Sequence, residues 1–561
     1  MYCNSMHLTC LVGFVQILGV WGSVSSKWVD QNTPVEDRVI FKGDVIENGD
    51  GIENVAEYKL VMSDEFEESG REFDSTANDP MWTAISKPDD TNQAAQFYDP
   101  GHVSTVDGKL QILTTPDKVK WKQWDWSVAG FNEFSKNYTS GMVMSWNKFC
   151  FTGGVLEVSA QLPGDGVSGT FWPAAWLMGN LAKATFGPST EHMWPWSTDE
   201  CGDLSRDAQK ISACRWTAEE DEWGMNPYQS RGAPEVDLFE VMPGIEGMDE
   251  KYNYQSYIST SLQVSPAIPK HHPVNLHPLN SSDTWYSPRH GNRTQPNTMF
   301  YSETAGMGYL EWLEKGYVAD AVSGNTKITN DHFSSQHIYR LEWEPGADGH
   351  LNWYVDGEFL WGVDGADLKA KSGAVIPEEP MYLIFNTAIS DSWAMPEPCD
   401  MKNCHSCYRC YDCTNPDCYC SMPTGMQGCA NFPGRYLIDY VRIYQDPNNP
   451  KHTLECDTKD FPSAQYIAKN GKLFTEWQPD HLGPFFGLTF AQFLLAVVLG
   501  TAGICFITRT ANQRRRNMRR AEYQALRGKK SFAATKNSAV SSSQESMAPT
   551  GTVNASNVVK K

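Results

Sequence analysis

The chain has 561 residues and a formal net charge of −22 at pH 7, with 68 Asp and Glu against 46 Lys and Arg. This acidic balance excludes nucleic acid as a partner, because the phosphate backbone would repel the chain. The charge is also uneven. Residues 509–561 hold 12 basic and 2 acidic side chains, a surplus of ten positive charges that leaves −32 on the rest.

The amino-terminal residues predict a secretory signal. Residues 7–24 are uncharged and largely apolar, and small residues follow at 23–26. This run is short for a membrane span and suits a cleavable signal over residues 1–25, although no Lys or Arg precedes it. An uncleaved anchor is the alternative. We expect residues 26–55 to be a lumenal lead-in to the folded domain.

Residues 56–449 are expected to form one large all-β domain. Short runs rich in β-branched and aromatic residues alternate with Gly, Pro, Asn and Asp turns, a pattern typical of a sandwich or jelly roll. Asp356-Gly357 favours a tight hairpin. The predicted strands are 58–62, 110–113, 154–160, 337–343, 351–355, 381–385 and 436–444.

Three carboxylates, Glu235, Asp237 and Glu240, lie within six residues of an otherwise apolar run. In a strand, Glu235 and Asp237 share a face, whereas regular alternation sends Glu240 to the opposite face. A β-bulge between Asp237 and Glu240 would bring all three onto one surface. Two carboxyls about 5 Å apart suit a retaining glycosidase. The alternative is an acidic strand edge that faces solvent.

Aromatic residues are expected both in the core and at a sugar-binding face. The chain has 20 Trp, and flat indole rings stack on the apolar faces of sugars or fill a sandwich core. We expect about half of the candidates to be core residues. The candidates are Trp146, Trp172, Trp176, Trp194, Trp196, Trp343, Trp353 and Trp393.

The cysteines fit an oxidising compartment. Eight of them crowd into residues 399–429, and behind a secretory signal this spacing favours a disulfide-stapled insert, with zinc or iron–sulfur ligation as the alternative. Their pairing is left open. The sequons at Asn137, Asn280 and Asn292 predict glycosylation.

Histidines of a polar loop do not predict a metal site. They lie at 271, 272, 277 and 290 without the fixed spacing that metal ligands need. No cofactor is expected. Structural calcium is common in such folds, but no cluster of Asp and Asn specifies a place for it.

The carboxy-terminal region predicts a membrane anchor. After a lumenal stalk over 450–484, residues 485–507 form 23 uncharged residues, long enough to cross a bilayer. Arg residues follow at once, so residues 508–561 are expected to be a basic, disordered cytoplasmic tail. The chain would then be a single-pass type I protein of the secretory pathway or plasma membrane.

Several longer blocks resemble one family. They are similar to the fungal β-1,6-glucan synthesis-associated proteins, which are of the laminarinase-like glycoside hydrolase family 16 type. The likeness begins near residue 60 and continues past the sandwich to 463. The blocks are 145–154, 171–180, 193–196, 233–240, 376–382 and 438–445.

The resemblance implies a concanavalin-like jelly roll with a concave glucan-binding face and retaining chemistry. It makes Glu235 the nucleophile, Asp237 the assisting carboxylate and Glu240 the general acid/base. Two features depart from the family: the carboxy-terminal anchor, where fungal members have a long amino-terminal cytoplasmic tail, and the cysteine-rich insert.

The substrate-binding residues expected at the glucan-binding face are weaker assignments. Four of them are aromatic. For His337, at the start of a strand, and Asn386, at the end of another, a structural role is the alternative. The expected set is Trp146, Trp172, Trp176, Trp194, His337 and Asn386.

Three functions are considered for this chain. The first is a β-glucan transglycosylase or hydrolase, with glucan chains as donor and acceptor and a glucan synthase complex as a further partner. The second is a non-catalytic glucan-binding scaffold, which the loss of Glu235 or Glu240 would have favoured. The third, a receptor that signals through the basic tail, has little support, because residues 509–561 contain no recognisable module.

Overall fold

The computed structural model describes a large part of the chain between residues 27 and 477. The described ranges are 27–45, 52–92, 94–125, 127–166, 170–190, 193–195, 231–242, 256–264, 289–297, 320–372, 374–390, 413, 427–475 and 477. Among these residues, no helix has the length and apolar character needed to span a membrane. The predicted signal and the predicted span at 485–507 lie outside the described residues.

The described residues form mainly antiparallel β-structure, as predicted for an all-β protein. In the larger sheet, ten strands run in the order β1 (Val39–Val45), β2 (Ile52–Asp64), β23 (Gly434–Gln445), β12 (Gly154–Gln161), β19 (His337–Glu344), β20 (His350–Val355), β21 (Glu358–Asp364) and β16 (Arg289–His290), with β7 (Lys109–Thr114) on β23 and β6 (Val103–Val106) on β7. Every pairing in it is antiparallel.

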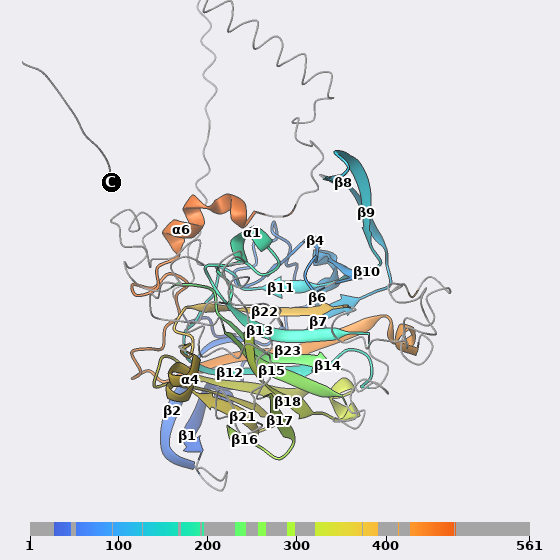
Figure 1. Ribbon diagram of the computed structural model, residues 1–561. Helices are drawn as coiled ribbons and strands as arrows, with labels where there is room; N and C mark the ends of the chain where they lie inside the picture. Colours follow the sequence, from blue (N-terminus) through green and yellow to red (C-terminus); the bar gives the residue numbers. More distant parts are fainter. Residues whose placement is uncertain are drawn as a thin grey trace, which may run out of the picture. The chain divides into compact units, whose positions relative to one another are not determined.

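The smaller of the two main sheets carries the predicted carboxylates. Its eight strands run β17 (Thr294–Asn297), β18 (Asp320–Lys327), β15 (Tyr257–Val264), β14 (Glu235–Met242), β13 (Trp172–Gly179), β22 (Met381–Ala388), β11 (Met142–Met144) and β3 (Thr83–Ala84). Figure 1 shows β13, β14, β15 and β22 beside one another.

Shorter elements complete the described part. Two small sheets pair β10 (Tyr138–Ser140), β5 (Gln96–Tyr98) and β4 (Lys87–Pro88), and β8 (Val119–Asp125) with β9 (Gly130–Lys136). The described α-helices are α1 (Gly187–Thr190), α4 (Gly365–Ser372) and α6 (Ala464–Lys469). The 3₁₀ turns are Val35–Arg38, Pro100–His102, Asn330–Phe333, Gln427–Asn431 and Gly471–Leu473.

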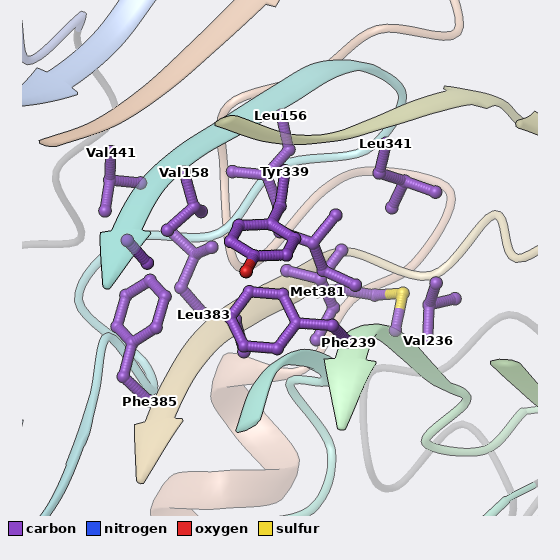
Figure 2. Packing of buried hydrophobic residues seen from close by; sticks show 14 of the residues in the cluster. Leu156, Val158, Val236, Phe239, Tyr339, Leu341, Met381, Leu383, Phe385 and Val441 are labelled. Carbon is purple, nitrogen blue, oxygen red and sulfur yellow. The ribbon is translucent and has the colours of Figure 1, made fainter. Parts of the chain in front are cut away.

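The hydrophobic core lies between the two main sheets. Phe239 of the smaller sheet and Tyr339 of the larger sheet meet with ring centroids 4.2 Å apart, and Figure 2 shows both within the cluster. Trp343 and Trp353 are fully buried in the same core. Two curled sheets around one apolar layer are consistent with the predicted jelly roll.

The predicted strand positions agree with the structure. All seven predicted runs fall on β2, β7, β12, β19, β20, β22 and β23. The Asp356-Gly357 turn joins β20 to β21, and both residues have positive φ (50° and 79°), as a type I′ turn requires.

Both boundaries of the domain differ from the prediction. Within the predicted lead-in 26–55, β1 pairs with β2, and Trp28 packs against the main core. Beyond residue 449, Cys456 forms a disulfide with Cys150, 306 residues earlier, and α6 buries Tyr466. Residues 450–475 are therefore part of the packed domain and not of the stalk predicted over 450–484.

The cysteine-rich insert shows one disulfide among its described residues. Cys413 and Cys429 are bonded, which agrees with the disulfide prediction for 399–429. The other six cysteines of this insert lie outside the described residues.

The chain divides into two compact units. One comprises Met1–Trp121 with Glu133–Pro479, and the other Lys122–Asn132 with Asp480–Lys561. The described residues of the second unit belong to the β8–β9 hairpin, in which Trp124 and Phe131 meet edge to face at 5.4 Å.

Candidate functional site

A β-bulge in β14 brings the three carboxylates onto one face. Asp237 pairs with Ser261 of β15, but Glu240 pairs with Ser259, so one extra residue lies in β14 between the two pairs. Leu238 and Phe239 both enter the hydrophobic core as a result. The bulge predicted from the spacing of the carboxylates is thus present, and Glu240 returns to the face of Glu235 and Asp237.

Strand register extends this face across four strands. Partners that lie directly opposite in neighbouring strands point to the same side of a sheet. Each carboxylate therefore belongs to a row of four side chains that crosses β15, β14, β13 and β22. Trp176 lies in the row of Asp237, and Asn386 in the row of Glu240. The rows are Gln263–Glu235–Met178–Tyr382, Ser261–Asp237–Trp176–Ile384 and Ser259–Glu240–Ala174–Asn386.

Each outer carboxylate accepts a hydrogen bond from an indole. Trp194 Nε1 donates to Glu235 Oε2 at 2.6 Å, and Trp172 Nε1 donates to Glu240 Oε1 at 3.1 Å. Glu235 and Glu240 are half-buried. Since each indole occupies an oxygen of one carboxylate, it restricts the rotation of that side chain.

The central carboxylate is held from the neighbouring strand. Asp237 is only 2% exposed, and its Oδ2 accepts hydrogen bonds from Ser261 Oγ and, at 3.4 Å, from Gln263 Nε2. On the other side of the strand, Trp353 Nε1 donates to the carbonyl of Asp237 at 2.9 Å and ties the bulge to the core. These contacts fix the middle of the triad.

Burial raises the pKa of all three carboxyls. Desolvation raises the pKa of Asp237 to about 6, against the opposing hydrogen bonds of Ser261 and Gln263. The pKa of Glu235 is well above its usual range through desolvation and then through the charges of Asp237 and Glu240, while the Trp194 hydrogen bond lowers it. Desolvation, followed by the charge of Asp237, also raises the pKa of Glu240. Closely spaced carboxyls with raised pKa values are typical of acid/base chemistry.

These shifts predict a pH-dependent effect of Glu240→Gln on stability. A carboxyl whose folded-state pKa is raised stabilises the fold below its unfolded pKa of about 4.3, and this contribution is lost as the pH rises through the folded pKa. At pH 7 the variant should exceed the wild type in free energy of unfolding, because it removes the cost of ionising a buried carboxyl. At pH 4 the difference should vanish. Urea denaturation at the two pH values measures both, and a constant difference would contradict the shift.

Trp176 and Asn386 form a second polar contact on this face. Trp176 Nε1 donates to Asn386 Oδ1 at 2.8 Å, and Asn386 Nδ2 donates to Tyr98 OH at 3.1 Å. Asn386 is buried, at 6% exposure, and its amide oxygen orients the indole of Trp176 through this hydrogen bond. Its sugar-binding role stays a prediction.

The other predicted substrate residues have different surroundings. The Trp146 ring stacks on Phe474 at 5.1 Å. His337 begins β19 in the larger sheet, and its Nδ1 lies 2.7 Å from Asp356 Oδ2. The structure therefore does not bring His337 into the rows of the carboxylates, and its binding role stays a prediction. Trp196 and Trp393 lie outside the described residues.

The predicted glycosylation sites are only partly described. Asn292 is exposed in the turn between β16 and β17, and Asn137 is half-buried. Asn280 lies outside the described residues. Among the described residues, no group of three or more His, Cys, Asp or Glu is arranged to hold a metal ion.

Sequence reasoning missed three residues of the site: Ser261, Gln263 and Tyr98. Ser261 and Gln263 donate hydrogen bonds to Asp237. The sequence of their strand, β15, is that of an ordinary half-polar strand and does not predict its pairing with β14. Alternating Ser259, Ser261 and Gln263 on one face of an otherwise apolar strand was the available signal. Tyr98 lies in a three-residue strand without a distinctive pattern.

Comparison with known proteins identifies the family. The model of the family described as "Beta-glucan synthesis-associated protein SKN1/KRE6/Sbg1" matches residues 22–405. The chain belongs to this family. The resemblance seen in the sequence blocks is thereby confirmed.

Two curated members of the beta-glucan synthesis-associated family that are similar to this chain come from yeasts. SKN1 of Candida albicans is 28% identical over 473 residues, covering 80% of this chain and 52% of that protein. KRE6 of Saccharomyces cerevisiae is 28% identical over 458 residues, covering 75% and 52%. The chain thus spans about half the length of these family members.

Solved structures similar to this family member include glucanases. The catalytic domain of an endo-1,3-beta-glucanase (laminarinase) from Thermotoga petrophila is 17% identical with a TM-score of 0.36, covering 70% of this chain and 100% of that one. The endo-beta-1,3-glucanase of Pyrococcus furiosus is 17% identical with a TM-score of 0.36, covering 73% and 98%.

Proposed function

We propose that the protein is a membrane-anchored, retaining β-glucan transglycosylase or hydrolase that acts in the synthesis or remodelling of β-1,6-branched glucan. The observation that carries the proposal is the bulge in β14, which sets Glu235, Asp237 and Glu240 on one face with a separate hydrogen-bond donor for each. The family supports the link to β-glucan synthesis. The anchor at 485–507 would hold this face in the secretory pathway or at the plasma membrane.

In the first step, a β-1,3-linked glucan binds across the rows, with Trp172 and Trp176 beside its rings. Glu235 attacks the anomeric carbon and forms a glycosyl ester, while Glu240 gives its proton to the departing glycosidic oxygen. The raised pKa of Glu240 keeps this proton in place before the attack. Trp194 favours the ionised form of Glu235, which the attack requires.

In the second step, Glu240 is a carboxylate and removes a proton from the acceptor. The acceptor oxygen attacks the same carbon, Glu235 leaves, and the original configuration is restored. Water as the acceptor gives hydrolysis. A glucan hydroxyl, such as a 6-OH, gives a new linkage. We favour the glucan, because an enzyme held where the polymer is made gains more from joining chains than from degrading them.

The two indole contacts predict effects on different limbs of the pH profile. Trp194→Phe removes the hydrogen bond that lowers the pKa of Glu235, so the acid limb of kcat/KM should move to higher pH. Trp172→Phe removes the corresponding bond to Glu240, so the alkaline limb should also move to higher pH. Each variant keeps an aromatic ring and serves as the control for the other. If one variant moved both limbs, the separate roles would be refuted.

The proposed function is tested with the purified full-length chain and its Glu235→Gln variant. Both are incubated with labelled β-1,3-gluco-oligosaccharides, and the products are separated by size and linkage. Longer or 1,6-linked products from the wild type alone would establish a transglycosylase, and only shorter products a hydrolase. Binding without turnover in both proteins would overturn the proposal and favour a non-catalytic scaffold in a glucan synthase complex.

A further inference from the structure

A segment beyond β23, residues 454–475, is fastened to the loops that follow two strands of the smaller sheet. We call this segment the strap. Cys456 is bonded to Cys150, which follows β11, and both side chains are buried. Asn180, the residue after β13, is also buried, and its Nδ2 donates to Ser463 Oγ at 3.2 Å. A covalent bond and a buried polar contact thus hold the strap in place.

The strap packs against the residue that precedes Trp194. Met193 is fully buried, in one hydrophobic cluster with Tyr466, Ile467 and Phe474 of the strap. Protein interiors are close-packed and transmit strain, so a shift of the strap would move Met193 and the backbone of the next residue. The strap therefore fixes the point from which the Trp194 indole projects.

A buried lysine makes a second tie between the strap and the same loop. Lys183 is 5% exposed, and its Nζ donates to the carbonyl of Phe474 at 3.3 Å. The ammonium group also lies 4.1 Å from the centroid of the Phe186 ring and 5.0 Å from that of Trp146. Phe474 in turn stacks on Trp146 at 5.1 Å. The strap thus holds the beginning of the loop as well as its end.

The strap also contacts the segment that enters β14. Arg231 lies four residues before Glu235, and its Nη1 donates to the carbonyl of Pro462 at 3.0 Å. Two residues further along, the N–H of Ala233 donates to the carbonyl of Met193 at 3.0 Å and joins this segment to the loop. The strap therefore touches both of the segments that bring the indole and the nucleophile together.

We infer that the strap, through Phe474 and Ile467, positions the Trp194 indole on Glu235, so that the site is complete only when the strap is packed. For its effect on catalysis, this inference rests on the proposed function. Trp194 Nε1 lies 2.6 Å from Glu235 Oε2, and a bond this short restricts the carboxylate that would attack the sugar. A misplacement of about 1 Å at such a group can cost about 100-fold in rate. Phe474 and Ile467 act through Met193, and are positioning residues.

The test follows the Trp194 indole by fluorine NMR in the full-length chain, grown with 5-fluorotryptophan. The Trp194 line is the one absent from Trp194→Phe, and its change with pH, which Glu235→Gln should abolish, reports the ionisation of Glu235. The strap variants are Phe474→Ala and Ile467→Ala, with Phe474→Leu as the conservative replacement. The matched control is Leu60→Ala, because Leu60 is 5% exposed, as Phe474 is, but packs in a separate cluster on the larger sheet. Urea unfolding and turnover of β-1,3-gluco-oligosaccharide are measured on the same samples.

In both alanine variants of the strap, the change of the Trp194 line with pH should shrink by about half or more. Their kcat should fall about tenfold while KM stays within about twofold, as for the loss of one hydrogen bond to a charged group. Phe474→Leu should recover most of both properties. Leu60→Ala should lose stability but keep the line and kcat of the wild type.

An unchanged Trp194 line in the strap variants, or an equal change in Leu60→Ala, would overturn the positioning role and leave the strap as a stabilising segment only. If Phe474→Ala does not fold, Ile467→Ala and Phe474→Leu decide the question in the same way. If the line changes as expected but the wild type itself does not turn over glucan, the proposed function fails and the positioning of Trp194 stands.

Discussion

Glu235→Gln is expected to reduce kcat of the proposed glucan reaction by on the order of 10⁴-fold or more, because no glycosyl ester can form without the nucleophile. The fold should remain, since glutamine has the shape of glutamate and still accepts the Trp194 hydrogen bond at Oε1. Initial rates with labelled oligosaccharide measure the loss. Glu133→Gln, an exposed carboxylate of the β8–β9 hairpin, is the matched control and should keep full activity.

Azide separates the role of Glu235 from that of Glu240. In Glu235→Ala, azide can attack an aryl β-glucan donor directly, and this single displacement should give an azide of inverted configuration. In Glu240→Ala, the glycosyl ester still forms, so azide should give the retained configuration. The product configurations are read by NMR. The reverse pattern would exchange the two assignments, and the absence of rescue in both would contradict a retaining mechanism.

Arg231→Met is expected to destabilise the fold by about 3–5 kcal/mol, because it leaves a carboxylate buried without its partner. The Arg231 side chain is fully buried, and its guanidinium binds Glu379 through two bonds of 2.5 and 3.0 Å. A third bond of 3.0 Å reaches the carbonyl of Pro462, in the segment before α6. Chemical denaturation measures the free energy of unfolding.

Two further variants test the cause of this loss. The double variant Arg231→Met/Glu379→Leu should recover most of the stability, since no buried charge then remains. Lys120→Met breaks an exposed pair and should cost less than 1 kcal/mol. A small loss in Arg231→Met, or no recovery in the double variant, would show that the buried charge is not the cause.

Local patterns predicted the strands and the bulge of β14 well. The residues of β2, β12, β19 and β23 have local sequence patterns typical of strands. The dipeptide Asp356-Gly357 is by itself typical of a type I′ turn. The β14 bulge was predictable because buried carboxylates are too costly to lie on a core-facing side. Glu240 therefore had to return to the outer face.

Long-range contacts could not be predicted in the same way. Ser261 reaches Asp237 across 24 residues, and Tyr98 reaches Asn386 across 288. No local preference encodes such pairings. The packing of residues 450–475 was missed for the same reason, because the Cys150–Cys456 bond depends on which of many cysteines pair. The sequence around His337 correctly predicted a strand, β19. It did not show that this strand belongs to the larger sheet and not to the sheet of the carboxylates.

The position of β23 constrains the order in which the protein can fold as it is synthesised. This strand, Gly434–Gln445, pairs with β2, β7 and β12, so it joins strands made some 275 or more residues earlier. Until it emerges from the ribosome, those strands have unpaired edges that invite aggregation. The growing chain must therefore be shielded almost to the end of translation, and a nonsense mutation before residue 434 would leave a product that cannot close its larger sheet.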